Sequence, residues 1–242
     1  MSKYSGLSLI EMMLSLFLAT VLIALLTGQY LIVKQHYYRL QDLLDYALEL
    51  DWIEDLIRNS VHGAGFTPCV GLNWLKTLDG RTGKKLAVIE VKQSGSLATY
   101  RMSEQFDSVL RYDTNSVVIT GNHLYKKNQT VLIADCFHAE VRTIATIQRR
   151  KSEKIITLKT PIIFDYVEPI YLGEWIEEHF FIQKNSAGKE ALYYQRGRAE
   201  ELTPIVKNLS ATLHSGQKLI MQLLLTLTNG ETVKIEAATR TP

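Results

Sequence analysis

Residues 12–33 read MMLSLFLATVLIALLTGQYLIV, a run of 22 residues without a formal charge. A helix rises about 1.5 Å per residue, so this stretch would extend about 33 Å, enough to cross the ~30 Å hydrocarbon core of a bilayer. A secretory signal peptide has a shorter apolar region and a small-residue cleavage site after it, and no convincing site of that kind follows here. A helix buried in a soluble core does not need so long an uncharged run. We therefore predict a transmembrane helix.

The composition of the whole chain is that of a folded protein. Of its 242 residues, 46% are hydrophobic and 21% are charged, with 27 Lys plus Arg against 25 Asp plus Glu. The length allows one domain, or one domain with an appendage. The near balance of charge excludes a histone-like nucleic-acid binder. Two cysteines are too few for a disulfide-rich scaffold or a four-cysteine zinc site.

The apolar run leads into an amphipathic segment. Residues 34–61 contain no Pro or Gly, and their apolar residues recur three and four positions apart, with charges in much of the remainder. The sequence His62-Gly63-Ala64-Gly65 is a stop signal. We expect one helix over residues 7–62, about 80 Å long, as a filament subunit would have. A coiled-coil stalk is the alternative, although charges interrupt its heptads after two or three.

The remainder of the chain is typical of β structure. Strand-like runs occur at 86–91, 116–120, 131–134, 139–144, 154–158, 170–172, 178–182, 191–194, 209–213 and 219–228. Several alternate apolar with polar residues, as half-buried antiparallel strands do. Asn229-Gly230, between 219–228 and 232–237, is the strongest hairpin signal. No convincing second long helix follows residue 62. The predicted class is α+β, a long N-terminal helix packed on antiparallel β-sheets.

The residues before the apolar run carry a resemblance to a known family. Gly6 is followed by Leu7-Ser8-Leu9-Ile10-Glu11 and then by the long apolar helix. This arrangement resembles the leader of type IV prepilins. The resemblance implies that a prepilin peptidase cuts after Gly6 and methylates the new amino terminus at Leu7, where the family more often has Phe. It also implies a pilin-like fold.

Four segments follow from the resemblance together with the patterns above. They are a leader peptide at 1–6, a transmembrane helix segment at 7–33, an amphipathic periplasmic half of the helix at 34–62 and a globular β-rich periplasmic domain at 63–242.

Glu11 matches the hallmark glutamate of that family. A carboxylate at the edge of the hydrocarbon is costly, and pairing with the amine of a neighbouring subunit makes both ions tolerable. Glu11 would then set the register between subunits, whereas in an isolated anchor it would extend to the headgroups.

Gly28 costs ~1 kcal/mol relative to Ala in a helix. By the resemblance it gives the helix flexibility in the filament, and close helix packing is the other interpretation.

Further matches narrow the resemblance to PilW-type minor pilins, which are similar to J-type pseudopilins of type II secretion. These matches are Arg58 with residues 64–69, Asp135-Cys136, Leu192-Tyr193, Glu201-Leu202, Val206 and Asn208-Leu209. Tyr194 and Gln195 depart from the arginine that often follows in the family. Membership implies a low-abundance subunit of the initiation or tip complex. Its partners would be other minor pilins, the major pilin, the inner membrane and a tip adhesin.

Cys69 and Cys136 raise the question of a disulfide. Outside the cytoplasm a pair of thiols seldom stays reduced, so we expect a Cys69–Cys136 bridge if the domain is periplasmic. The bridge would close a loop of ~66 intervening residues and stabilise the fold by ~4 kcal/mol in the chain-entropy model. Two separate buried thiols are the alternative.

Motifs of catalysis and of cofactor binding are missing from the sequence. It has no Walker-type phosphate loop and no G-x-S-x-G motif. Its six histidines lack metal-ligand spacing, and His179 beside Glu177 and Glu178 is interpreted as an ordinary strand edge. The basic clusters at 126–127 and 149–154 are interpreted as charged hairpin ends, without the interleaved aromatic residues of a nucleic-acid platform. We expect no enzyme activity, cofactor, metal or nucleic-acid partner.

The predicted function is therefore structural. We expect a minor pilin of a type IV pilus, inserted once in the bacterial inner membrane with its C-terminal domain in the periplasm before it enters the pilus or its tip. A J-type pseudopilin of a type II secretion system is the first alternative. A membrane-anchored periplasmic binding protein or enzyme is the second.

Overall fold

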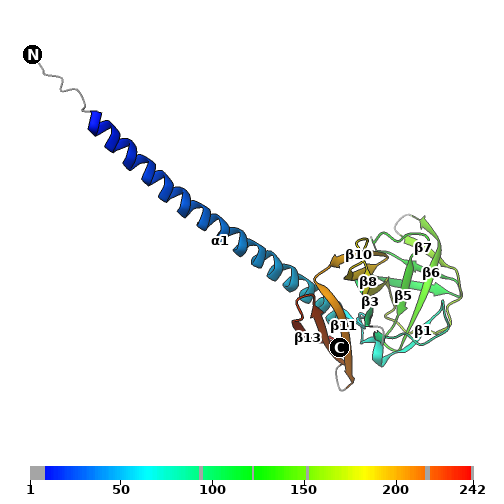
Figure 1. Ribbon diagram of the computed structural model, residues 1–242. Helices are drawn as coiled ribbons and strands as arrows, with labels where there is room; N and C mark the ends of the chain where they lie inside the picture. The colour runs from blue at the N-terminus through cyan, green and yellow to red at the C-terminus, as the bar shows by residue number, and fades with distance from the viewer. Residues whose placement is uncertain (1–8, 93–94, 122, 151–152, 216–218, 241–242) are drawn as a thin grey trace, which may run out of the picture. The chain divides into compact units, whose positions relative to one another are not determined.

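The computed structural model describes residues 9–92, 95–121, 123–150, 153–215 and 219–240 (Figure 1). The chain forms two compact units, Met1–Trp52 and Ile53–Pro242. Gly6 and Leu7, the predicted cleavage and methylation sites, lie outside the described residues.

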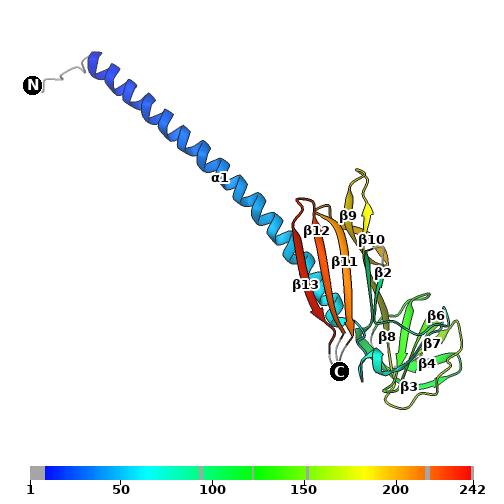
Figure 2. The same ribbon diagram turned by 60° about the horizontal axis from the view of Figure 1, so that its bottom comes forward.

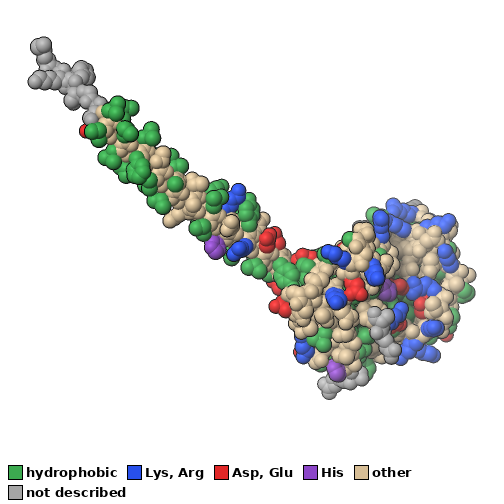
Figure 3. Space-filling model, viewed as in Figure 1, with side chains coloured by type: hydrophobic (Ala, Val, Ile, Leu, Met, Phe, Trp, Pro, Cys, Tyr) green, Lys and Arg blue, Asp and Glu red, His purple; other side chains and the backbone are tan. Residues whose placement is uncertain are grey.

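The first unit is helical. Helix α1 runs over Leu9–Gly63, 55 residues, and its part up to Trp52 belongs to this unit. Hydrophobic side chains dominate the N-terminal part of α1, and charged side chains gather toward its C-terminal part (Figure 3). The single long helix expected from the sequence is therefore confirmed over the described residues, with its C-terminal end one residue beyond the predicted boundary.

The last turns of α1 belong to the second unit and are packed in it. Ile53, Ile57 and Val61 follow one another at intervals of four and are fully buried, so they form one face of the helix. The chain then leaves the helix through Gly65, whose φ of +76° favours glycine. A Cβ at this position would also lie only 2.9 Å from the side chain of Val88.

The rest of the second unit is β structure in two sheets. The larger sheet contains β1 (Lys76–Asp79), β2 (Ile89–Lys92), β3 (Ser96–Asp113), β4 (Ser116–Ile119), β5 (Thr130–Ala134), β6 (His138–Arg150), β7 (Glu153–Leu158), β8 (Tyr171–Lys184), β9 (Glu190–Arg196) and β10 (Arg198–Thr203). The smaller sheet contains β11 (Val206–Ser215), β12 (Leu219–Leu227) and β13 (Thr232–Ala238), side by side in Figure 2. A short 3-10 helix, η1 (Leu72–Trp74), precedes β1.

Six strands of the larger sheet close into a ring. β3 pairs with β8 and β4, β4 with β7, β7 with β6, β6 with β5, and β5 with β8, and every one of these pairings is antiparallel. β3 joins two parts of the ring because it is 18 residues long and shifts its register between Met102 and Phe106. Apolar side chains fill the interior, as in other small barrels. The buried members are Val109, Val117, Ile119, Tyr125, Val131, Ile133, Ile144, Ile156, Leu158, Tyr166, Ile170 and Leu172.

The remaining strands extend this ring. β9 and β10 continue the sheet from β8, β2 pairs with β3, and β1 pairs in parallel with β6. The predicted hairpin at Asn229-Gly230 is confirmed: β12 and β13 pair antiparallel, and Gly230 has a φ of +89°.

The predicted α+β class is confirmed, a long N-terminal helix with antiparallel β-sheets, but several strand predictions were incomplete. The runs at 170–172 and 178–182 belong to one strand, β8. β1, β3 and β10 were not predicted.

Candidate functional site: the apolar helix and the disulfide-bonded junction

The N-terminal part of α1 is long and apolar enough to cross a membrane. Its large side chains are open to the surroundings: Leu22 is 59% exposed and Leu26 is 68% exposed. The hydroxyls of Ser15, Thr20 and Thr27 donate to backbone carbonyls three or four residues earlier, at 2.9, 2.7 and 2.7 Å. These hydroxyls therefore need no water as a partner, which suits a hydrocarbon environment.

Two predicted site residues lie on this helix. Glu11 is in the first turn of α1, where the helix dipole favours a negative charge. α1 continues through Gly28, and a Cβ added there would meet no atom within 4 Å. The structure thus places both residues on one continuous helix, and the roles predicted for them, subunit pairing and helix flexibility, stay predictions.

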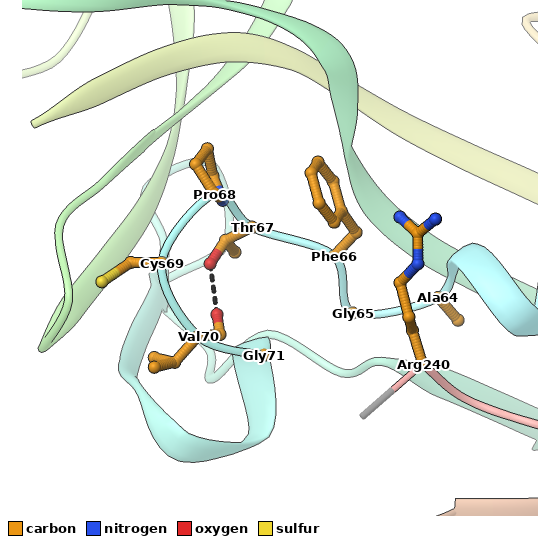
Figure 4. A pocket seen from close by; sticks show the side chains of 9 residues that line it. All are labelled: Ala64, Gly65, Phe66, Thr67, Pro68, Cys69, Val70, Gly71 and Arg240. Carbon is orange, nitrogen blue, oxygen red and sulfur yellow. Dashed lines mark hydrogen bonds between the residues drawn. The ribbon is translucent and has the colours of Figure 1, made fainter. Parts of the chain in front are cut away.

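Cys69, a further predicted site residue, lies in the junction between α1 and the β domain, residues 64–71 (Figure 4). The Gly65 amide donates to the Tyr100 carbonyl at 2.7 Å, which ties the junction to β3, and the Gly65 carbonyl accepts from the Leu72 amide at 2.9 Å. Within the junction the Thr67 hydroxyl donates to the Val70 carbonyl. The loop is therefore fastened at both ends.

Cys69 of this junction is bonded to Cys136, so the predicted disulfide is confirmed. Its two cysteines are 67 positions apart in the sequence. Cys136 lies in the turn between β5 and β6. The bridge therefore joins the segment that follows α1 directly to the ring of strands.

Asp135 organises the turn that carries Cys136. Its fully buried carboxylate accepts from the amides of Phe137 and His138, and from that of Val167 at 2.9 Å. Burial acts to raise the pKa of Asp135, but these hydrogen bonds outweigh it and hold the pKa below its ordinary value. The charged carboxylate is therefore part of the folded turn. From the sequence, Asp135 was singled out only as the neighbour of Cys136, and this role in the turn was not predicted.

The C-terminal end of the chain also meets this junction. The Arg240 guanidinium lies 5.8 Å from the centre of the Phe66 ring and 3.2 Å from the Glu104 carboxylate. Arg240 and residues 64–71 line a hollow of about 200 Å³, and Figure 4 shows the guanidinium beside the ring. The Arg240 amide donates to the His62 carbonyl at 3.0 Å, which supplies a partner for a carbonyl at the helix end.

A buried polar network fixes the last turns of α1 to the sheet. The Glu178 carboxylate accepts from the Ser60 hydroxyl at 2.8 Å and from the Tyr194 hydroxyl at 2.8 Å. The Arg101 guanidinium lies 3.4 Å from the same carboxylate. Burial, and then Glu178, raise the pKa of Tyr194 to about 12, so its hydroxyl remains a donor at neutral pH. α1, β3, β8 and β9 are thereby held together.

This network was not predicted from the sequence. In the sequence, Glu178 stands beside Glu177 and His179 and was predicted to lie at an ordinary strand edge. Neighbouring residues of a strand point to opposite faces. Glu178 turns toward Ser60, while His179 lies edge-on to Tyr100 at 6.1 Å. Among the described residues, no group of three or more His, Cys, Asp and Glu side chains is placed to hold a metal ion.

No family model, no curated protein and no solved structure matches the chain. A functional assignment therefore depends on the residues and geometry described above.

Proposed function

We propose that the protein is a minor pilin of a type IV pilus, similar to the PilW type, and a structural subunit of the complex that initiates assembly. The observation that carries this proposal is the continuous helix α1. It carries Glu11 in its first turn and then an apolar segment, and its last turns are buried in the β domain. A helix of this kind gives one subunit a membrane anchor that is continuous in the chain with the buried turns of its β domain.

The residues suggest a physical order of events. A prepilin peptidase removes residues 1–6 and leaves an amine at Leu7, close to the Glu11 carboxylate of an adjacent subunit. Each ion is costly near hydrocarbon, and the pair is less so. The pair therefore sets the axial register as the helix packs against other minor pilins and the major pilin. The Glu178 network holds the last turns of α1 in the β domain, and the disulfide holds the segment that follows them.

A J-type pseudopilin of a type II secretion system would have the same anchor and the same register residue. The two functions differ in their partners. Crosslinking to pilins or to pseudopilins in the native host separates them.

Leader processing is the first test. Coexpression with a prepilin peptidase should shorten the chain by residues 1–6, as read from the intact mass. Gly6→Val should block the cut, because a branched side chain at the scissile position obstructs the protease. Thr20→Ala, on the same helix beyond the leader, is the matched control and should be processed normally. A chain that keeps its full mass beside an active peptidase contradicts the pilin assignment.

Glu11→Ala is the second test, because it separates an assembling subunit from a simple anchor. The abundance in the membrane fraction should be unchanged or higher, since a charge costs up to ~2.5–3.5 kcal/mol on insertion scales. Crosslinks to other minor pilins should fall, because the amine of the neighbour loses its counter-ion. Thr20→Ala again serves as the control. Unchanged crosslinks would assign Glu11 to the headgroup region and leave α1 as a tether.

A further inference from the structure

One face of the larger sheet carries a row of aromatic side chains. Tyr100 of β3 lies directly opposite Glu177 of β8, and Phe181 of β8 lies opposite Tyr193 of β9. Residues directly opposite each other share a face, as do alternate residues of a strand. The row, named here the aromatic strip, comprises Tyr100, Trp175, His179, Phe181 and Tyr193. The Glu178 network lies on the other face.

The rings of the aromatic strip contact one another. Tyr100 and Trp175 are near parallel, 13° apart, with ring centres 6.0 Å apart, and Phe181 and Tyr193 are likewise near parallel with centres 5.8 Å apart. Trp175 is buried beneath its neighbours, while the other four members are half-buried. Residues 175–181 span about 20 Å along β8. The strip is therefore an ordered, extended aromatic surface, open on one side.

A hollow of about 210 Å³ adjoins the end of the strip at Tyr100 and Trp175. Arg81 lies in it, held by both oxygens of Asp79 at 2.9 Å and by Glu177 at 2.7 Å. Glu177 also accepts from the Trp175 indole at 2.8 Å. A fork-like Arg–carboxylate pair of this kind is strongly oriented, so the polar groups of the hollow are fixed before any ligand arrives.

Further groups of the hollow present donors and acceptors beside the rings. The Tyr100 hydroxyl donates to the exposed Glu90 carboxylate at 3.2 Å. Burial, and then Glu90, raise the pKa of Tyr100 well above its ordinary value, so the hydroxyl stays protonated. At the other end of the strip, the Tyr193 hydroxyl donates to Glu201 at 3.4 Å. Both ends of the strip therefore combine an aromatic ring with a carboxylate acceptor.

The charges of the hollow select among ligand classes. Its carboxylates, Asp79, Glu90 and Glu177, are balanced by Arg81, Lys84 and Lys85. A polyanion such as a nucleic acid gains little electrostatic affinity from a hollow in which acidic and basic residues balance. It is also repelled by Glu201 at the far end of the strip. A polycation is opposed by the three basic residues. An uncharged ligand with many hydroxyls and flat apolar faces fits both the rings and the fixed polar groups.

We propose that the aromatic strip and the adjoining hollow bind a neutral saccharide chain. The apolar faces of sugar rings lie on Tyr100 and Tyr193, His179 stands edge-on between them, and one terminal sugar enters the hollow. Its hydroxyls donate to the carboxylates of Glu90 and Glu177 and accept from Arg81. This inference does not depend on the filament role, because every residue in it belongs to the β domain.

Calorimetric titration tests the proposal with the full-length protein in a polyoxyethylene detergent, since a maltoside headgroup would compete. The probes are maltotetraose, cellotetraose and N-acetylated chitotetraose, with spermidine as the cationic comparison. At least one saccharide should bind. Tyr100→Thr and Tyr193→Thr keep a strand-forming side chain and should each weaken binding by about tenfold, the equivalent of one aromatic contact. Glu90→Gln should weaken it by severalfold.

Phe137→Thr is the matched control, because Phe137 is an exposed aromatic residue away from the strip, 61% accessible. It should bind as the wild type does. If circular dichroism shows that Tyr100→Thr is unfolded, the exposed Glu90→Gln and the half-buried Tyr193→Thr carry the test. The proposal is overturned if none of the saccharides binds at millimolar concentration, if the strip variants bind as well as Phe137→Thr, or if spermidine alone binds.

Discussion

Leucine behaves differently in the two units of the molecule. Leu22 and Leu26 of the helical unit are more than half exposed, whereas Leu132 and Leu172 of the β unit are fully buried. Backbone hydrogen bonding explains why leucines can be exposed in one unit and buried in the other. A helix satisfies its own amides and carbonyls within one segment, but a strand needs partners from elsewhere in the chain. The helical unit can therefore leave its apolar side chains to an external environment, and the β unit cannot.

Polar side chains show the same contrast. In the helical unit the hydroxyls of Ser15, Thr20 and Thr27 bond to the preceding turn. In the β unit, Ser60 bonds to Glu178, 118 positions away. The helical unit is thus stabilised by local contacts, and the β unit by contacts between distant segments. Substitutions that loosen distant contacts should damage only the β unit.

The largest effect is expected from removing the disulfide. Cys69→Ser with Cys136→Ser releases a long loop in the unfolded chain and should lower the free energy of unfolding of the β unit by about 4 kcal/mol. Denaturant titration followed by tryptophan fluorescence measures it, with leader processing and membrane abundance as controls. If the variant also lost its abundance in the membrane fraction, the stability of the β unit and the insertion of the helical unit would not be independent.

The second largest effect is expected when a buried leucine is shortened, and an exposed leucine serves for comparison. Leu132→Ala removes a fully buried side chain and should lower the free energy of unfolding of the β unit by about 3 kcal/mol, through lost burial and the cavity that remains. Leu22→Ala is the matched control and should leave that free energy unchanged. A similar loss in both variants would contradict the contrast between an external and an internal apolar surface.

The third effect depends on pH. Asp135→Asn leaves an acceptor for some of the amides of the turn but loses the charge, and should cost about 2 kcal/mol at neutral pH. Because the pKa of Asp135 is lowered in the folded state, its contribution is complete above the unfolded pKa of about 3.9 and is lost as the pH falls through the folded pKa. The difference between wild type and variant should therefore shrink in acid. Asp165→Asn, at an exposed loop position, should show no such difference.

The sequence predicted helix α1 well because the signals of a helix are local. The uncharged run, the period of three to four and the glycines after His62 all lie within the segment that they describe. The disulfide was also predictable, since only one pair of cysteines exists and the expected compartment is oxidising. Glu11 and Gly28 were found by resemblance, and the structure adds that they share one continuous helix.

The sequence could not predict the closed ring or the buried network. β3 reads as mixed polar and apolar because its face changes at the register shift near Phe106, so no simple alternation runs along it. Glu178 looks like a surface acid beside His179. Its burial depends on Ser60, Arg101 and Tyr194, which only the fold brings together. Such sites are set by strand register, which is a long-range property.

The smallest effect is expected at Gly28. A substitution there tests whether the helical unit needs a residue of low helix propensity at this position. Gly28→Ala meets no neighbouring atom and should favour the helix by about 1 kcal/mol. Circular dichroism in detergent should show equal or higher helix content, and the β unit should unfold as in the wild type. Ala24→Gly, one turn away, is the reverse change and should lower helix content.

The two interpretations of Gly28 then separate in assembly. If its role is flexibility, Gly28→Ala should reduce crosslinks to other pilins while membrane abundance stays constant, because a stiffer helix resists the local unwinding that a filament would impose. Gly28→Ser is small, polar and a poorer helix former than Ala, so it should retain more of the crosslinks. If close helix packing is the reason for glycine, both variants should lose crosslinks in proportion to side-chain size. If Gly28→Ser therefore loses more crosslinks than Gly28→Ala, the loss follows side-chain size and not helix propensity. That result would reject flexibility as the role of Gly28.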